Sequence, residues 1–294
     1  MKELFNCYAN NDQPSGCTRD DMSKLVRNLK TMLRDVGLKD GDTVFVHSGV
    51  GALTALTGGA PASLPEAIEA LHEALWTVIG EDGTIAAPGF FYDYARKSKP
   101  FDVDRSPPDR MLGFYPPHLM KQQGCRRSLN PIASILAVGK NADTICAHTS
   151  AHAFGITSPW ARMVELDTKS LVIGIPFMMT FIHHIEALVG PPHVYNKIFR
   201  TPVIAGGKAI DLPVIASVRY LDYDIHYKNG PVDELRAADV LTEVVEGGVN
   251  CQLISFRDAL RVIGDGLARD SNFTLLRPPK YVAGQVPDDG PARE

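Results

Sequence analysis

The segment MTFIHHIEALVG, residues 179–190, places two histidines and a glutamate inside an otherwise apolar stretch. Its spacing predicts a helix on which His183 and Glu186, three residues apart, share a face, while His184 points about 100° away from His183. A carboxylate beside an imidazole fixes the tautomer of the ring and stabilises its protonated form, so the ring binds a proton more strongly, which suits a general base near neutral pH. The pair is therefore a candidate for proton transfer. The alternative is a core histidine that the glutamate holds for stability alone.

A metal site is a second interpretation of this region, with His183, His184, Glu186 and His193 as candidate ligands. Adjacent histidines on one helix cannot both face one ion, and the zinc motif H-E-x-x-H is absent from the sequence. We therefore expect no metal. A metal-dependent hydrolase built on these histidines is retained as an alternative function.

The second candidate region is VHSGVGALTALTGGAP, residues 46–61, where an expected strand runs into a glycine-rich loop and then a helix. Unpaired backbone N–H groups in such a loop can hold a phosphate or pyrophosphate, although a tight strand-to-helix turn gives the same pattern. The spacing matches neither G-x-G-x-x-G nor G-x-x-x-x-G-K-[ST], and no G-x-S-x-G is present. Dinucleotide-binding, P-loop and serine-hydrolase interpretations are therefore excluded.

Two short polar groups lie further along the chain. Arg126, Arg127 and Ser128 precede an expected strand and could hold phosphate or pair with surface carboxylates. Asp222 and Asp224 are two apart, hence on one face of a strand, and either could bring a second carboxylate to the histidine. The alternative is a pair of solvated charges at a sheet edge.

The elements that must position these groups predict an α/β protein. Apolar spacing and capping residues predict helices over 18–37 and 63–80, the first capped by Thr18 and the second by a capping box of Ser63 and Glu66. Short apolar runs predict strands over 42–49, 83–91, 134–139 and 170–176. We expect a central mostly parallel or mixed sheet flanked by helices, with an antiparallel extension at about residues 200–228.

The domain organisation predicted is one compact unit over residues 1–294, with the tails 1–17 and 280–294 peripheral. Residues 93–131 are rich in proline, aspartate and arginine, and we expect them to form an insertion that lines the substrate site.

Composition excludes several classes of function. The net charge of −4, with both signs mixed along the chain, gives no basic run for nucleic acid and no cationic stretch for a membrane surface. The longest apolar run, residues 170–182, is shorter than the ~20 residues that span a bilayer, and no secretory signal is visible. Five scattered cysteines without a C-x-x-C pair indicate a reducing compartment, so we expect a cytoplasmic protein.

The order of the motifs makes the chain similar to a known family. It resembles the aminoglycoside 3-N-acetyltransferase-like family of antibiotic N-acetyltransferases, which is distinct from the GNAT acetyltransferases. The resemblance covers about residues 20–265 and rests on VFVHSGVGALTALTGGA, GTIAAPGF, RRSLNPIASILAVG, FGITSPWARM, LVIGIP, TFIHHIE as a T-x-x-H-x-x-E motif, and YLDYD. It implies direct acyl transfer from acetyl-coenzyme A, or a related acyl-CoA, to a primary amine, usually on a sugar.

Site roles follow from the resemblance position by position. It implies that His183 is the general base, Glu186 its partner, and Asp222 the second carboxylate, with Asp224 as the alternative. The coenzyme-binding residues that it implies are Ser48, Gly49, Val50, Arg127, Ser128 and Thr180. The predicted substrate-binding residues are Tyr92, Asp93, Lys197 and Asp224. The partner is a small-molecule amine, and a homodimer is a candidate assembly.

Two departures from the family pattern bear on the acceptor. Asn130 stands where the family often has histidine in R-S-x-H-P, and the insertion lacks an obvious acidic lining. Lys197 and Arg200 follow the motif, and they would repel a polycationic aminoglycoside but attract a phosphorylated sugar. A biosynthetic N-acyltransferase for a nucleotide-linked amino sugar is therefore an alternative to an antibiotic-resistance enzyme. A non-catalytic ligand-binding protein of the same fold is a third.

Overall fold

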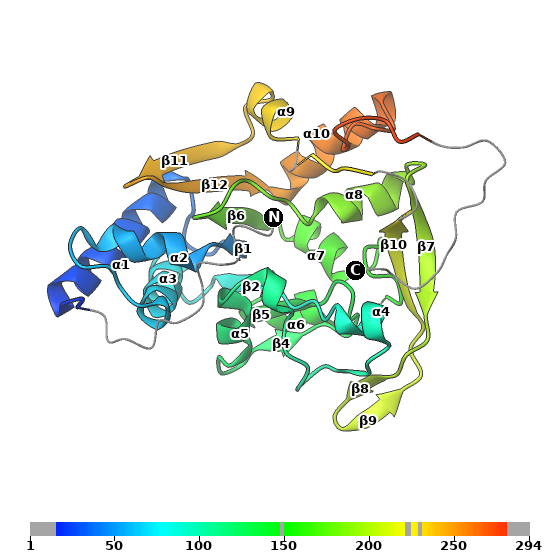
Figure 1. Cartoon of the computed structure of the whole chain (residues 1–294), viewed down its shortest axis with the longest axis horizontal. Coiled ribbons are helices and arrows are strands. Elements are labelled where there is room, and N and C mark those ends of the chain that lie inside the picture. Colours follow the sequence, from blue (N-terminus) through cyan, green and yellow to red (C-terminus); the bar gives the residue numbers. More distant parts are fainter. Residues whose placement is uncertain (1–15, 148–149, 221–224, 229–230, 281–294) are drawn as a thin grey trace.

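A seven-stranded sheet forms the centre of the computed structural model, which describes residues 16–147, 150–220, 225–228 and 231–280. The strand order is β11-β12-β6-β1-β2-β5-β4 (Figure 1). The strands are β1 (Thr43–Ser48), β2 (Thr84–Pro88), β4 (Arg126–Arg127), β5 (Ile135–Gly139), β6 (Lys169–Ile173), β11 (Thr242–Glu246) and β12 (Val249–Ser255). The four strands predicted from apolar runs, β1, β2, β5 and β6, are thus all present, and they form the middle of the sheet.

The sheet was predicted to be mostly parallel or mixed. It is mixed, and most of its strand pairs are antiparallel. Only β1 pairs in parallel, with β2 on one side and β6 on the other. The remaining neighbours are antiparallel: β2 with β5, β5 with β4, β6 with β12, and β12 with β11. A strand that is buried on both faces is a continuous apolar run whether it pairs in parallel or antiparallel, so its composition does not predict the direction of pairing.

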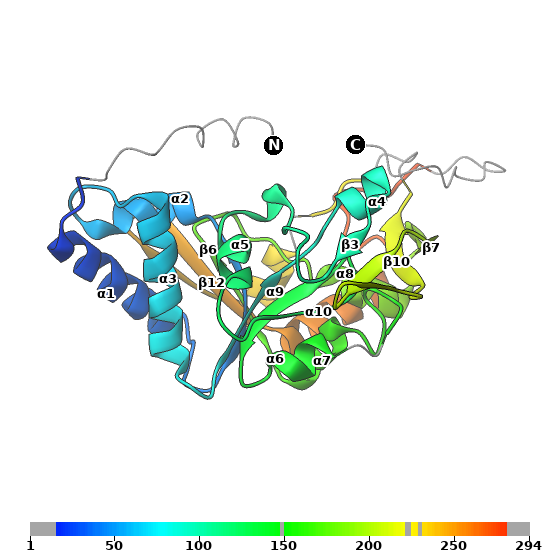
Figure 2. The ribbon, with the colours of Figure 1, turned by 90° about the horizontal axis from the view of Figure 1, so that it is seen from below.

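Helices cover both faces of the sheet (Figures 1 and 2). They are α1 (Arg19–Asp35), α2 (Val50–Leu53), α3 (Leu64–Ile79), α4 (Asp93–Lys97), α5 (Tyr115–Met120), α6 (Ala142–Cys146), α7 (Pro159–Glu165), α8 (Ile182–Val189), α9 (Val232–Ala237) and α10 (Phe256–Arg269), with 3₁₀ turns η2 (Thr54–Thr57) and η3 (Arg110–Leu112). Strand β1 shows how the faces divide. Val44 and Val46 join a first core with α1 and α3, whereas Phe45 joins a second core with α7, α8 and α10.

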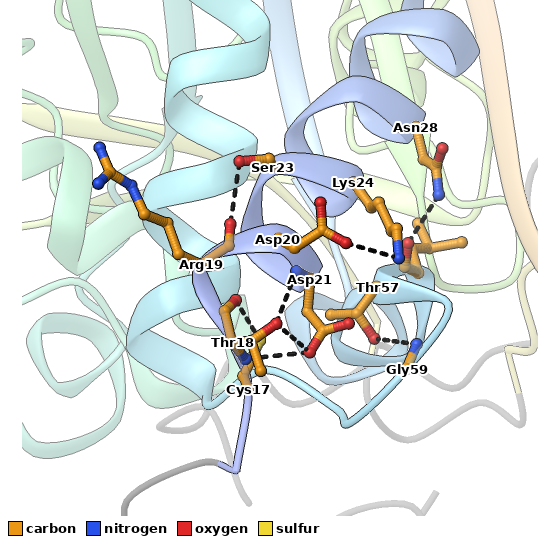
Figure 3. A network of polar contacts seen from close by, with 11 residues as sticks. Cys17, Thr18, Arg19, Asp20, Asp21, Ser23, Lys24, Asn28, Thr57 and Gly59 are labelled. Carbon is orange, nitrogen blue, oxygen red and sulfur yellow. Dashed lines mark hydrogen bonds and ion pairs between the residues drawn. The ribbon is translucent and has the colours of Figure 1, made fainter.

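The first layer is fixed by the helix caps that the sequence predicts. The Thr18 hydroxyl accepts a hydrogen bond from the Asp21 N–H at 3.2 Å, and the Thr18 N–H donates to the Asp21 carboxylate at 3.0 Å, which closes a capping box (Figure 3). Ser63 and Glu66 form the corresponding box at the start of α3. Gly59 packs against this cap so closely that a Cβ there would lie 2.3 Å from Asp21 Oδ1. The segment after β1 that contains Gly59 therefore packs directly against the start of α1.

The glycine-rich segment after β1 differs from its prediction as a loop. It forms the short helix α2 followed by the 3₁₀ turn η2. Val50, Leu53 and Leu56 recur at helical spacing within it and are all buried in the first core. Their burial explains why this stretch takes helical structure despite its glycines.

The predicted antiparallel extension is present but begins earlier than expected. Strand β7 (Val194–Phe199) pairs antiparallel with β10 (Val214–Arg219), and β8 (Val203–Ala205) pairs antiparallel with β9 (Lys208–Ile210). Strand β3 (Phe101–Asp102) runs parallel to β8 and so ties the 93–131 insertion to this extension. In Figure 1 the extension lies at the side of the molecule opposite α1 and α3.

The C-terminal part contains elements that no prediction covered. Strands β11 and β12 form a hairpin across Gly247 and Gly248, both with positive φ, and α10 follows directly with Ser255 as its cap. The α10 residues Phe256, Ala259 and Ile263 complete the second core. Over the described residues, none of the helices has the length and apolar character required to cross a bilayer.

Candidate active site

A cavity of about 470 Å³ lies between the antiparallel extension and the second core. Its walls come from α4, α8, β7, β10, the segments before α4, β5, α7 and α8, and the segment that carries Tyr227. The lining residues are Phe90, Tyr92, Ala95, Arg96, Ile132, Phe154, Met178, Thr180, His183, Glu186, Val194, Tyr195, Lys197, Phe199, Ser217, Val218, Arg219 and Tyr227. The size is that of a small-molecule site, and the wall combines aromatic rings with a few charged groups.

Helix α8 brings the histidine and the glutamate to this cavity. Phe181 stacks on Phe256 at 4.0 Å between ring centroids, and Ile185 is fully buried beside them, so one stripe of the helix is fixed in the second core. His183 then faces the cavity with 37% of its side chain exposed, while Glu186 lies behind it at 1%. The predicted shared face is confirmed, with His183 Nδ1 3.0 Å from Glu186 Oε2.

His184 points away, as the helical spacing predicted. Its ring is buried, and its Nδ1–H donates to the Phe154 carbonyl oxygen at 2.7 Å. This histidine holds the loop before α7 rather than facing the cavity.

The Glu186 carboxylate accepts four hydrogen bonds, two on each oxygen. Oε2 takes the His183 bond and a longer one of 3.3 Å from the Tyr227 hydroxyl. Oε1 takes one of 3.0 Å from His193 Nε2 and one of 2.8 Å from the Thr274 hydroxyl. Burial alone would raise the pKa of this carboxyl, but the hydrogen bonds from the two histidines and the threonine lower it to about 2. Glu186 is therefore ionised at neutral pH.

Ionisation of Glu186 decides the tautomer of both histidines. A carboxylate only accepts hydrogen bonds, so His183 must carry its proton on Nδ1 and His193 on Nε2. The Nε2 atom of neutral His183 is then bare and belongs to the ring that faces the cavity. This is the form in which an imidazole acts as a general base.

The geometry does not favour a metal site. His183 and His193 contact different oxygens of Glu186, and His184 is turned away. Within the described ranges, no three histidine, cysteine, aspartate or glutamate side chains are grouped as ligands for an ion. The metal-dependent hydrolase alternative therefore gains no support.

The residues expected to bind the coenzyme fall into two groups. Thr180 lines the cavity, and its hydroxyl lies 3.0 Å from His47 Nε2 at the end of β1. Ser48, Gly49 and Val50 continue from His47 but are not among the lining residues. The Gly49 N–H already donates to the Ile173 carbonyl at 2.9 Å, and a Cβ at that position would lie 2.4 Å from the Gly174 oxygen. Gly49 is thus required for close packing against the end of β6.

Arg127 and Ser128 serve the fold rather than the cavity. The Arg127 guanidinium donates to the carbonyl oxygens of Ser106 and Gly89 and lies 4.6 Å from the centre of the Phe101 ring. Burial lowers its pKa to about 10, which leaves it charged at neutral pH. The Ser128 hydroxyl accepts the Ile135 N–H at 2.9 Å. Neither residue lines the cavity, so their predicted role at the coenzyme gains no support.

The predicted substrate residues are divided as well. Tyr92 and Lys197 line the cavity, whereas Asp93 lies outside it, where it pairs with Lys97 and Lys99. The two aspartates Asp222 and Asp224 lie outside the described residues. Arg200 is exposed and is not part of the lining, although its charge was expected to act together with that of Lys197.

Several site residues were not found from the sequence. Tyr227 and Thr274 join Glu186 from separate segments, and Tyr227 is placed by an isolated bridge to Leu275. Arg96 lies 4.9 Å from the centre of the Tyr92 ring, and Arg219 lies 6.0 Å from that of Tyr227. The alternating pattern of residues 218–227 could have pointed to Tyr227, whereas no local pattern marks Thr274.

An imidazole that is hydrogen-bonded to a buried carboxylate and lines a small-molecule cavity is the arrangement that a general base requires. Comparison with known proteins shows the family to which the chain belongs. A sequence profile described as aminoglycoside 3-N-acetyltransferase matches residues 45–267. The chain belongs to the aminoglycoside 3-N-acetyltransferase family. The family predicted from the sequence is confirmed, and with it the enzyme class, an acyl-CoA-dependent N-acetyltransferase.

Curated relatives agree with this assignment. The chain is 30% identical over 200 residues to aminoglycoside N(3)-acetyltransferase IX of Micromonospora chalcea, a match covering 62% of this chain and 68% of the relative. It is 31% identical over 206 residues to aminoglycoside N(3)-acetyltransferase VII of Streptomyces paromomycinus, covering 64% and 67%. The matches thus span about two thirds of each relative.

Solved structures share the fold. AAC-IIIb in its binary complex with CoASH superposes with a TM-score of 0.70 at 24% identity, covering 83% of this chain and 96% of that one. AAC-VIa bound to sisomicin gives a TM-score of 0.69 at 25% identity, covering 84% and 97%. The mixed sheet with its helical layers and antiparallel extension is therefore an architecture found in aminoglycoside acetyltransferases.

Proposed function

We propose that this chain transfers an acetyl or related acyl group from acyl-coenzyme A to a primary amine of a small molecule, with His183 as the general base. The observation that carries the proposal is the 3.0 Å hydrogen bond between His183 Nδ1 and ionised Glu186 at the wall of the cavity. That bond leaves the Nε2 atom of the imidazole bare to accept a proton. The family supports the choice of acyl-CoA as the acyl donor.

The chemistry follows from what an amine needs. A primary amine is protonated at pH 7 and becomes a nucleophile only when it loses a proton. In the proposed mechanism that first proton goes to solvent as the amine binds, and His183 Nε2 takes a second proton from the nitrogen as it bonds to the thioester carbonyl carbon. Glu186 stabilises the imidazolium that forms, as its partner in the hydrogen bond. When the carbon–sulfur bond breaks, the coenzyme thiolate leaves with the bonding electrons and takes the proton from His183.

The first candidate acceptor is an amino sugar of the aminoglycoside type. The names of the curated relatives support it, as do the neighbouring structures solved with sisomicin, a gentamicin and apramycin. We expect purified protein with acetyl-CoA to release coenzyme A thiol when sisomicin, gentamicin or apramycin is added, and to form a product heavier by one acetyl group. A panel of amines without thiol release or acetylated product would contradict the proposal.

A second candidate acceptor is an amine that carries phosphate, such as a nucleotide-linked amino sugar. The observation that favours it is a pair of arginines on the cavity wall, Arg96 against Tyr92 and Arg219 against Tyr227. The carboxylate among the described lining residues, Glu186, already accepts bonds from two histidines. Guanidinium groups held on aromatic rings suit phosphate and repel a polycation.

Substitution of these arginines separates the two acceptors. Arg219→Gln should raise the KM for a nucleotide-linked amino sugar by about 10-fold, since one charge-assisted contact of ~1.5 kcal/mol is lost, and leave the KM for a neutral amine unchanged. Arg200→Gln is the matched control, because this exposed arginine is not part of the lining. Initial rates with both amines and with varied acetyl-CoA measure the effect. A rise only in the KM for acetyl-CoA would assign the arginine to the coenzyme and remove support for the anionic acceptor.

A further inference from the structure

Behind the cavity wall lies a histidine to which the mechanism above gives no role. His47, near the end of β1, is 7% exposed, and its ring packs edge-on against Phe45 in the second core. Its Nε2 atom is 3.0 Å from the hydroxyl of Thr180, a residue that lines the cavity together with His183. Its Nδ1 atom is buried and has no hydrogen-bond partner among the described residues.

His47 cannot share the acid–base role of His183. Burial lowers its pKa to about 4, and no carboxylate contributes to that shift. The ring is therefore neutral at the pH at which an amine is acylated. A neutral imidazole carries one N–H and one bare nitrogen, so its hydrogen-bonding role depends on which nitrogen holds the proton.

The buried surroundings decide between the two tautomers. With the proton on Nδ1, a donor would be buried without an acceptor, which proteins avoid more strictly than an unpaired acceptor. With the proton on Nε2, the ring donates to the Thr180 oxygen and leaves only an unpaired acceptor behind. In that arrangement the Thr180 hydroxyl accepts from His47, and its own proton is available for another acceptor.

We propose that His47 is a positioning residue that turns the Thr180 hydroxyl into a hydrogen-bond donor for the thioester oxygen. The inference rests on the proposed acyl transfer. When the amine nitrogen bonds to the carbonyl carbon, the carbonyl oxygen takes the electron pair of the double bond, and Thr180 donates to that oxyanion. The carbon–sulfur bond then breaks and the oxygen returns to a carbonyl. Thr180 keeps its proton throughout, and His183 alone moves one.

In this arrangement one residue stabilises the oxyanion and another removes the proton from the amine. Thr180 and His183 lie three residues apart around the start of α8 and line the same cavity. The donor toward the oxyanion is fixed by a neutral ring, whereas the base is fixed by an ionised carboxylate. A preorganised donor of this kind stabilises the transition state without reorienting during the reaction.

A double-mutant cycle tests the proposal. Thr180→Val removes the hydroxyl at nearly constant volume, and we expect kcat to fall by about 10²-fold, the usual cost of losing one oxyanion donor. His47→Leu removes the ring donor and should lower kcat by about 10-fold. The double variant should be no slower than Thr180→Val, because His47 acts only through the hydroxyl. His47→Gln places an amide N–H near the position of Nε2 and should restore most of kcat.

The control measurements separate positioning from folding and from the proposed function. The dissociation constant for acetyl-CoA and the thermal midpoint should remain close to wild type in His47→Gln. Losses that multiply in the double variant, or equal losses in His47→Leu and His47→Gln, would show a purely structural role and overturn the inference. Failure of the acyl-transfer proposal would instead appear as a wild-type protein without thiol release.

Discussion

Replacement of His183 by alanine should lower kcat by about 10²–10⁴-fold, which is the usual contribution of a general base. The side chain lines the cavity and is held by Glu186 through Nδ1, and in the proposed mechanism its Nε2 atom takes the proton of the amine. Nothing in this role involves ground-state binding of the coenzyme, so the dissociation constant for acetyl-CoA should change by less than about twofold. Steady-state thiol release and calorimetric titration with acetyl-CoA measure the two quantities.

The neighbouring histidine provides the matched control. His184 lies on the same helix turn but donates to the Phe154 carbonyl in the second core. His184→Ala should therefore lower the free energy of unfolding by about 1–3 kcal/mol, the cost of leaving a buried acceptor unpaired, while kcat stays within a few-fold of wild type. If His183→Ala retained wild-type kcat, or both variants lost activity equally, His183 would not be the base.

The different fates of these two histidines were predictable from the sequence. Helical periodicity places His183 on the face of Glu186 and turns His184 away, and the structure confirms both statements. The cap at Thr18 and the capping box of Ser63 and Glu66 were predictable for the same reason. In each case the interaction joins residues within one helical turn, where spacing determines geometry.

Contacts between distant segments were not predictable in this way. Glu186 receives donors from His193, Tyr227 and Thr274, which come from three segments brought together only by the fold. Arg127 shows the converse difficulty. Its position before a strand suggested a phosphate ligand, yet the chain folds so that backbone carbonyls surround its guanidinium. The local sequence around an arginine is the same whether its side chain binds a ligand or packs in the interior, so the sequence does not distinguish the two roles.

The four-donor environment of Glu186 leads to the second large effect, that of Glu186→Gln. An amide has one accepting oxygen and one donating NH₂ group, whereas His183 and His193 donate to different oxygens of the Glu186 carboxylate. One of the two rings must therefore change its tautomer. If His193 were the ring that changed, its proton would move to Nδ1, which is buried and has no partner among the described residues. His183 can change at lower cost, because its other nitrogen belongs to a partly exposed ring at the cavity.

With the His183 proton moved to Nε2, the ring can no longer accept a proton from the amine, and the imidazolium also loses its counter-ion. We expect kcat to fall by about 10³–10⁴-fold, as when a catalytic histidine is held in the wrong tautomer. Thr274→Val is the matched control, since it removes one of the four donors but keeps the charge and both histidine bonds. Its kcat should stay within about 10-fold of wild type, the effect of one hydrogen bond worth ~1 kcal/mol. Thiol release at saturating acetyl-CoA compares the variants, and equal losses in both would show that Glu186 acts by packing rather than by fixing the proton on His183.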